Sequence, residues 1–219
     1  MWDGEWNAGG GVHDESADTW MNLVTGKLAT ISRGTASGLT WDTAKKCAVF
    51  DTTTILDADS SDVSQILSLT NNLSQQYEVH CVYRVFGDTA ANGVRIFGHM
   101  YGIGLQVNYY ANSYGYNSSN PRIHGANPFV KSSDLNHITP VYAWYDGSTV
   151  NAVDYLYGST KSVSNGTIAD SSGFSLGGTN GTPCSSPVEL YAVRIYNRAL
   201  TTTERSGVYA VDAERFGIS

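Results

Sequence analysis

A glutamate and a histidine two positions apart, Glu78 and His80, are the residues whose types and spacing could support catalysis. They lie in a segment, 77–86, that alternates with the period of a β-strand, so both side chains are expected on one face. A carboxyl and an imidazole placed together could transfer protons to and from a substrate. The simpler interpretation is an ordinary pair of polar residues on a solvated strand face. The sequence contains no serine nucleophile elbow and no phosphate-binding loop, so it does not support catalysis.

A surface that binds sugars is the second candidate. Sugars are held by aromatic rings that stack on C–H faces and by Arg and amide groups that pair with hydroxyls. The segment 108–134 is rich in Tyr, Asn, Ser and Gly, as antibody binding loops are, and is far longer than a hairpin loop. Two other interpretations stay open: the segment packs on itself and covers a sheet, and the polar strand residues merely face solvent. The residues assigned to ligand binding are Arg95, His99, Tyr110, Tyr114, Tyr116 and Trp144.

Three aspartates that are close together in the sequence, Asp57, Asp59 and Asp62, form the candidate metal site. The sequence LDADSSD begins like an EF-hand loop but lacks Gly at the sixth loop position and Glu at the twelfth, which excludes an EF-hand. A looser Ca²⁺ site with oxygen ligands and an acidic turn that faces solvent both fit the pattern. We therefore expect no required cofactor, with calcium as an optional ligand.

The composition indicates which elements must position these residues. The 219 residues include 13 basic and 20 acidic side chains, for a net charge of -7, together with 23 Gly and 14 Tyr. A chain rich in Gly and Tyr and poor in charge favours short strands joined by turns. Its negative charge argues against nucleic-acid binding, and no segment approaches the ~18 apolar residues that insert into a membrane. The three cysteines are too scattered for a zinc site, and we expect them to be unpaired.

Alternation and turn signals predict strands along most of the chain. The predicted strands lie within 47–56, 77–86, 94–110, 138–146, 151–158, 173–178 and 188–197. Turn dipeptides such as Asp146-Gly147 and Asn165-Gly166 separate the later strands. Many short strands at this spacing, apolar on one side and polar on the other, indicate an all-β chain folded as an antiparallel β-sandwich.

Only two segments have helical character. The segment 65–69 is too short, and too rich in β-formers, to be predicted as a helix. Near the C-terminus, Thr201 and Glu204 have the spacing of a capping box, and the pattern then runs to a terminal glycine. We predict one short C-terminal helix that Gly207 interrupts or weakens. No internal repeat or low-complexity linker is present, so we expect a single domain over 1–219 that belongs to a longer protein.

The segment 189–204, ELYAVRIYNRALTTTE, resembles the closing signature of laminin-G-like domains in the concanavalin A-like lectin/glucanase superfamily. Residues 19–27, TWMNLVTGK, are similar to the Trp-x-x-Leu-x-x-Gly pattern that opens these domains. The resemblance covers nearly the whole chain and implies a two-sheet antiparallel jelly-roll β-sandwich. In hydrolases of this superfamily the catalytic carboxylates come from one strand, as Glu-x-Asp-x-x-Glu. No Glu of this sequence is followed two residues later by Asp.

These observations predict a module that is not an enzyme and that binds carbohydrate or another surface ligand. The resemblance implies an extracellular or virion protein, whose partner is a glycan or a cell-surface or virion protein. A structural protein-interaction module, such as a phage capsid-decoration or fibre domain, is the alternative hypothesis. A divergent glycoside hydrolase is a third and weaker one.

Overall fold

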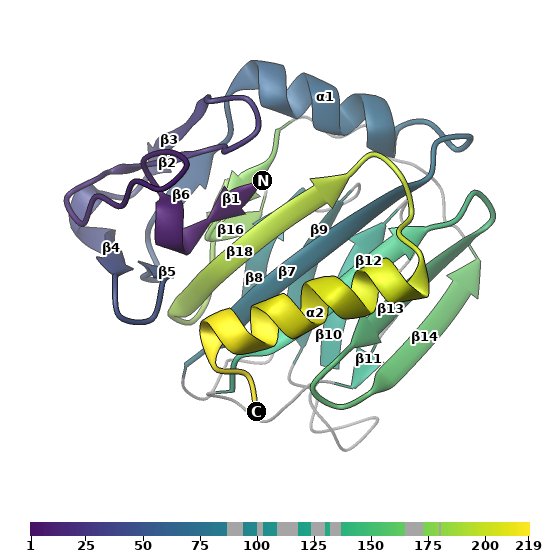
Figure 1. Cartoon of the computed structure of the whole chain (residues 1–219). Helices are drawn as coiled ribbons and strands as arrows, with labels where there is room; N and C mark the ends of the chain where they lie inside the picture. Colours follow the sequence, from purple (N-terminus) through teal and green to yellow (C-terminus); the bar gives the residue numbers. More distant parts are fainter. Residues whose placement is uncertain are drawn as a thin grey trace.

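The computed structural model describes residues 1–86, 94–99, 103–108, 118–123, 130–131, 137–164, 173–179 and 181–219. Within these ranges the chain forms two antiparallel sheets of eight strands each and a separate two-stranded hairpin (Figure 1). The sheets pack face to face, and the chain ends in one helix. This confirms the predicted all-β sandwich with a short C-terminal helix.

The first sheet has the strand order β14-β13-β12-β7-β18-β5-β4, and β1 pairs with β18 outside this path. Its central strand, β7, pairs with β12 on one side and with β18 on the other. The strands of this sheet are β1 (Trp2–Asp3), β4 (Leu39–Asp42), β5 (Cys47–Phe50), β7 (Tyr77–Val85), β12 (Thr139–Tyr145), β13 (Thr149–Asp154), β14 (Ser159–Ser164) and β18 (Val188–Tyr196).

The second sheet has the order β11-β10-β9-β8-β15-β6-β3-β2. Its strands are β2 (Thr19–Met21), β3 (Leu28–Arg33), β6 (Ile55–Asp57), β8 (Val94–Gly98), β9 (Ile103–Asn108), β10 (Ser118–Ile123), β11 (Val130–Lys131) and β15 (Ser175–Leu176). The hairpin joins β16 (Gly178–Thr179) to β17 (Thr182–Pro183). The segment 108–134 is therefore not one long loop, because β10 pairs with β9 along all six of its residues.

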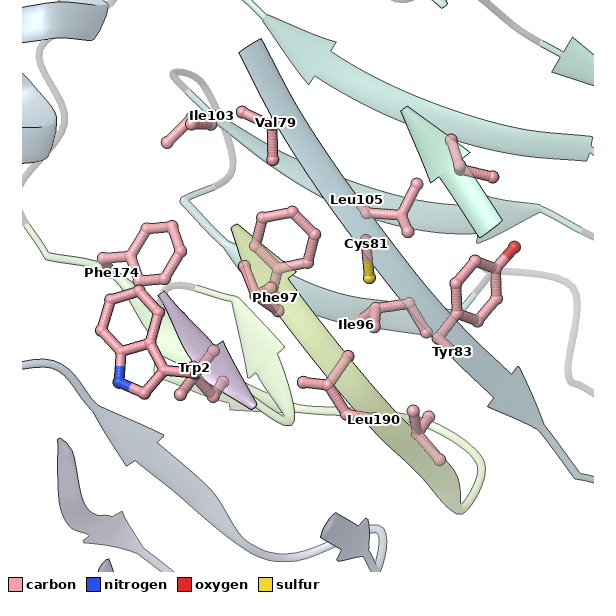
Figure 2. Close-up of a cluster of buried hydrophobic side chains, with 14 of the residues drawn as sticks. Trp2, Val79, Cys81, Tyr83, Ile96, Phe97, Ile103, Leu105, Phe174 and Leu190 are labelled. Atoms are coloured by element: carbon pink, nitrogen blue, oxygen red, sulfur yellow. The ribbon is translucent and has the colours of Figure 1, made fainter. Parts of the chain in front are cut away.

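The core lies between the two sheets and consists of the inward side chains of both. Trp2 of β1 stacks on Phe174, with ring centroids 5.3 Å apart, and both are almost completely buried (Figure 2). Val79 of β7 lies beside Ile103, and Cys81 of the same strand beside Leu105, both from β9 of the second sheet (Figure 2). All three cysteines are buried and free. The inward face of β7 thus has the composition that its alternation predicts.

Two α-helices and two short 3₁₀-helices complete the described fold. The 3₁₀-helices are η1 (Gly4–Trp6) and η2 (Ala36–Gly38). The first α-helix, α1 (Ser60–Thr70), contains the segment that sequence patterning left unassigned, so that expectation was wrong. Asp59 caps it by accepting a hydrogen bond from the Ser61 backbone, and packing of its buried side outweighs its weak helix propensity.

The second α-helix, α2 (Thr202–Phe216), has the predicted capping box between Thr201 and Glu204. It ends at Gly217, whose φ of 65° is the left-handed conformation that glycine adopts most easily. Gly207 lies inside a continuous helix, so the predicted interruption there was wrong. No helix in the described part of the chain is long and apolar enough to cross a membrane.

Candidate functional site

The outer face of the first sheet is covered by α2, which lies across β18, β7 and β12 (Figure 1). This overturns the interpretation of Glu78 and His80 as residues of a solvated face, because both are completely buried. Alternation predicted correctly that they share a face. It could not show that a helix more than 120 residues later in the chain would cover that face.

Glu78 is the centre of a buried polar cluster beneath α2. Its carboxylate accepts two hydrogen bonds from Arg205 of α2, at 2.7 and 2.8 Å, and one from the Leu200 backbone at 2.8 Å. His80 Nε2 lies 2.5 Å from the Glu78 Oε1 atom, and the His80 ring stacks on Tyr142 at 3.6 Å. These four contacts occupy both carboxylate oxygens. Glu78 therefore has no free acceptor capacity for a substrate.

Ionisation in this cluster follows from burial and pairing. Burial alone raises the pKa of Glu78, but hydrogen bonds from His80 and Arg205 outweigh it and hold the pKa below its usual value. Burial lowers the pKa of His80, against the opposing effect of Glu78, so the imidazole is neutral at pH 7. A carboxylate that is already ionised and saturated is a structural anchor for the helix.

A second anchor joins α2 to the sheet through Asp212. Its carboxylate accepts two hydrogen bonds from Arg194 of β18, each 2.8 Å long, and a third from the Tyr142 hydroxyl at 2.6 Å. Burial and the neighbouring Asp212 charge raise the pKa of Tyr142, so its hydroxyl remains a donor. At the end of the helix, Arg215 makes hydrogen bonds to Asp3 at 2.9 and 3.0 Å.

A groove of about 540 Å³ runs between α2 and the end of β18. We call it the β18–α2 groove. One wall is formed by Tyr196 and Leu200, and the other by Gly207, Val208 and Val211 of α2. The Val211 side chain is 52% exposed, and Tyr196 is half-buried. The groove thus combines apolar side chains with an aromatic ring.

Two features of this groove are not explained by contacts among the described residues. The Tyr196 ring packs against the His80 ring, with centroids 4.9 Å apart. Its hydroxyl makes no hydrogen bond within the described residues. Gly207 has helical geometry, and a Cβ built on it would meet no atom within 4 Å. An interior helix glycine costs about 1 kcal/mol relative to alanine. The fold itself therefore gives no steric reason for glycine at this position.

The charged residues of the groove include one exposed ion pair. Arg198 donates two hydrogen bonds to Glu204, at 2.6 and 2.9 Å, and the two side chains are 54% and 42% exposed. Glu204 also accepts hydrogen bonds from the backbone and hydroxyl of Thr201. Hydrogen bonds from Arg198 and then from Thr201 lower the pKa of Glu204 to about 2. Glu204 is therefore anionic throughout the physiological range.

Of the ligand-binding residues predicted from the sequence, the structure describes three, and these three do not share one surface. Arg95 lies on β8 of the second sheet between two core residues, and His99 is buried just after the same strand. Trp144 lies on β12 of the first sheet, where the Arg205 guanidinium covers its ring at 3.7 Å. Trp144 is thus part of the helix anchor and lies on the other sheet from Arg95. Tyr110, Tyr114 and Tyr116 lie outside the described residues.

The three aspartates of the predicted metal site take three different partners. Asp57 accepts a hydrogen bond from Ser175, Asp59 caps α1, and Asp62 accepts one from Asn22. In the ranges that the structure describes, no group of three or more His, Cys, Asp or Glu side chains is arranged to hold a metal ion. The calcium hypothesis stays a prediction from the sequence.

Sequence reasoning missed the β18–α2 groove although it had singled out the segment that forms one wall. Tyr196, Arg198 and Leu200 belong to the VRIYNRAL stretch, which was used only to infer the fold. The detectable signal was Gly207, an interior helix glycine only a few residues further along the chain.

The fold is shared with several solved structures. A sialidase of Trypanosoma rangeli matches 93% of this chain and 32% of its own, at 13% identity and a TM-score of 0.62. The binding domain of Paraclostridial Mosquitocidal Protein 1 matches 88% of this chain and 49% of its own, at 12% identity and a TM-score of 0.61. Domain 4 of an extracellular GH43 arabinanase from Geobacillus stearothermophilus, solved with arabinotriose, matches 83% of this chain and 87% of its own, at 16% identity and a TM-score of 0.51.

These similarities establish the class of fold alone, an antiparallel β-sandwich. The chain spans only about a third of the sialidase that it matches. No protein-family model and no curated protein sequence matches the chain.

Proposed function

We propose that this chain is a laminin-G-like, non-catalytic module that binds carbohydrate, and that the β18–α2 groove holds the sugar. We further propose that it belongs to a protein on an extracellular or virion surface, where glycans are presented. The groove is the observation that carries the proposal, because its Gly207 has no steric explanation and its Tyr196 hydroxyl has no hydrogen-bond partner among the described residues.

The size and lining of the groove suit a short saccharide. Its volume of about 540 Å³ is within the range of small-molecule sites, which are mostly apolar with a few placed polar groups. Val208 and Val211 can contact the C–H faces of a sugar ring. The Tyr196 hydroxyl can both donate and accept a hydrogen bond. Gly207 lets a ring approach the helix backbone more closely than any side chain would allow.

A binding role without catalysis agrees with the state of the carboxylates. A retaining glycosidase needs one nucleophilic carboxylate and one acid about 5 Å apart. Glu78 is saturated by four donors, and Asp212 by three. Glu204 is paired with Arg198. A sandwich of the same fold, the arabinanase domain, was solved with arabinotriose, which supports a sugar as the ligand class.

A glycan array tests the proposal with three proteins: wild type, Gly207→Gln and the control Ala210→Gln. Gln at position 207 fills the open space without opposing helix formation, whereas Ala210 is exposed on α2 and does not line the groove. We expect wild type and the control to bind the same glycans. Gly207→Gln should lose at least about tenfold in affinity, because its side chain would occupy the space of the sugar, and a loss of about 1.4 kcal/mol in binding free energy corresponds to tenfold.

Other outcomes of the array would assign a different function or site. Absence of binding to every glycan, together with self-assembly or docking to a coat protein, would favour the structural interaction module. Loss of binding in Tyr114→Ala and Tyr116→Ala, with Gly207→Gln unaffected, would move the site to the tyrosine-rich segment. Arrays run with calcium and with a chelator test the role of Asp57, Asp59 and Asp62, because the proposal requires no cofactor.

A further inference from the structure

We propose that Asp154 is a proton-operated latch at the edge of the first sheet: its protonated carboxyl secures the turn between β13 and β14, and loss of the proton loosens that turn. The turn comprises residues 155–158, and β14 is the last strand on its side of the sheet. The inference does not depend on the proposed carbohydrate binding, because neither Asp154 nor the turn lines the β18–α2 groove.

Asp154 points into the core from the end of β13. It shares a strand face with Val150 and Ala152, both of which belong to the core between the sheets, and it is completely buried. Its Oδ1 atom accepts hydrogen bonds from the backbone of Leu156 at 3.0 Å and of Tyr157 at 3.2 Å. Its Oδ2 atom is buried and has no hydrogen-bond partner among the described residues. One oxygen therefore fixes the turn, while the other lacks both water and a described donor.

The turn at the other end of β13 contains the same motif in a solvated form. Asp146 also accepts hydrogen bonds from the backbone two and three residues later, from Ser148 at 2.9 Å and from Thr149 at 2.8 Å. Three further donors reach its carboxylate, the hydroxyls of the same two residues and the Asn151 amide, so both oxygens are satisfied. Asp146 is also exposed. The two aspartates thus hold their turns in the same way but in opposite surroundings.

These surroundings give the two carboxyls different pKa values. Burial raises the pKa of Asp146, but hydrogen bonds from Thr149 and Ser148 outweigh it and hold the pKa well below its usual range. Burial raises the pKa of Asp154 to about 7, against the opposing effect of its two backbone hydrogen bonds. A carboxylate with one oxygen unpaired in the core is costly, and the neutral acid is much less so. Asp154 therefore gains and loses its proton near neutral pH.

The strands around Asp154 supply no described partner for its charge. Its direct neighbours on the same face are Val141 of β12 and Ser159 of β14, and Cys81 of β7 lies beyond Val141. The titratable residues on the strands that pack against β13 are Tyr142 and Tyr145 of β12, Lys161 of β14, Arg122 of β10 and Lys131 of β11. Among the side chains that the structure describes, none donates to Oδ2, so loss of the proton leaves a charge that only the turn backbone offsets.

The latch weakens as the pH rises. An aspartate in an unfolded chain titrates near pH ~3.9, whereas Asp154 keeps its proton up to about pH 7 in the fold. Between these values the folded chain binds more protons than the unfolded chain, so the stability from the bound proton is present at low pH and lost as the pH rises towards 7. The ionised carboxylate then favours states in which water reaches Oδ2. Opening of the turn, whose residues Tyr157 and Gly158 are exposed, admits that water.

Asp154→Asn and Asp146→Asn form a matched pair of variants that tests the latch. Asparagine at position 154 keeps an oxygen for the turn backbone and, like the protonated acid, carries no charge. The same change at position 146 removes a charge from the same motif where the carboxylate is exposed. The first measurement is the titration of the aspartate carboxyls of wild type by carbon-13 NMR, which depends on no variant. The second is hydrogen exchange of the β14 amides at pH 5.5 and pH 8, corrected for the intrinsic effect of pH.

In wild type we expect the Asp154 carboxyl to titrate with a midpoint near pH 7. Protection of the β14 amides should fall by about tenfold from the lower to the higher pH, since one released proton changes an equilibrium by up to about tenfold per pH unit. Asp154→Asn should show the same protection at both pH values, and Asp146→Asn should keep the pH dependence of wild type.

A midpoint for Asp154 below about pH 5, close to that of an unfolded chain, overturns the inference. Equal protection of β14 in wild type at the two pH values overturns it as well. So does a pH dependence that survives in Asp154→Asn, because the proton would then be bound elsewhere.

Discussion

The buried face beneath α2 and the β18–α2 groove at its edge involve the same helix but differ in how their polar groups are satisfied. Beneath the helix, Glu78 accepts four hydrogen bonds and Asp212 three, and both are completely buried. In the groove, the ion pair of Arg198 is exposed and the Tyr196 hydroxyl has no partner in the described fold. Saturated groups hold elements together, whereas unused bonding capacity at a surface is available to a ligand.

The largest expected effect comes from breaking the buried anchor. Arg205→Met keeps an apolar stem over Trp144 but leaves the Glu78 carboxylate buried without its arginine partner. Because an unpaired buried charge is costly, we expect the free energy of unfolding to fall by about 3–5 kcal/mol. Urea denaturation of wild type and Arg205→Met measures this difference in the free energy of unfolding.

The exposed pair provides the matched comparison for this loss. Arg198→Gln also removes an arginine from an ion pair with a glutamate, but in the groove we expect no measurable loss of stability. Similar losses in the two variants would mean that the buried face and the groove do not differ as described.

A smaller effect is expected on the pH dependence of folding stability, through His80 in the buried face. Burial lowers the pKa of His80 in the folded protein, whereas in the unfolded chain a histidine titrates near pH ~6.5. Below that pH the unfolded chain binds a proton that the buried ring does not bind, so His80 costs stability as the pH falls. The stability advantage of wild type over His80→Gln should therefore shrink from pH 7.5 to 5.5. A constant gap for His80→Gln would contradict the neutral imidazole.

The smallest expected effect lies in the groove and has the opposite sign. Gly207→Ala should raise the free energy of unfolding by about 0.5–1 kcal/mol, because alanine is the better helix former and its methyl group enters open space. Thermal and urea unfolding measure the gain. A loss of stability would show that Gly207 has a packing role, and the main reason to infer a ligand in the groove would disappear.

Strand patterning and helix capping were predictable because both depend on neighbours in the sequence. The alternation of 77–86 predicted the inner face of β7, and the Thr201/Glu204 spacing predicted where α2 begins. α1 was missed because tertiary packing, with Ile66 on its buried side, outweighs local propensity. The contact of Arg205 with the Trp144 ring could not be predicted, because nothing near Trp144 in the sequence indicates it.

By itself, the sequence determined the class of fold, the main strands and the final helix, since these follow from residue periodicity and from local hydrogen bonds. Only the tertiary structure decided that the polar face of β7 is buried. That burial depends on Arg205 reaching Glu78 across 127 residues. The tertiary structure also creates the groove, because the groove forms where α2 packs beside the end of β18. Periodicity shows which residues share a face, but what covers that face depends on contacts between residues far apart in the chain.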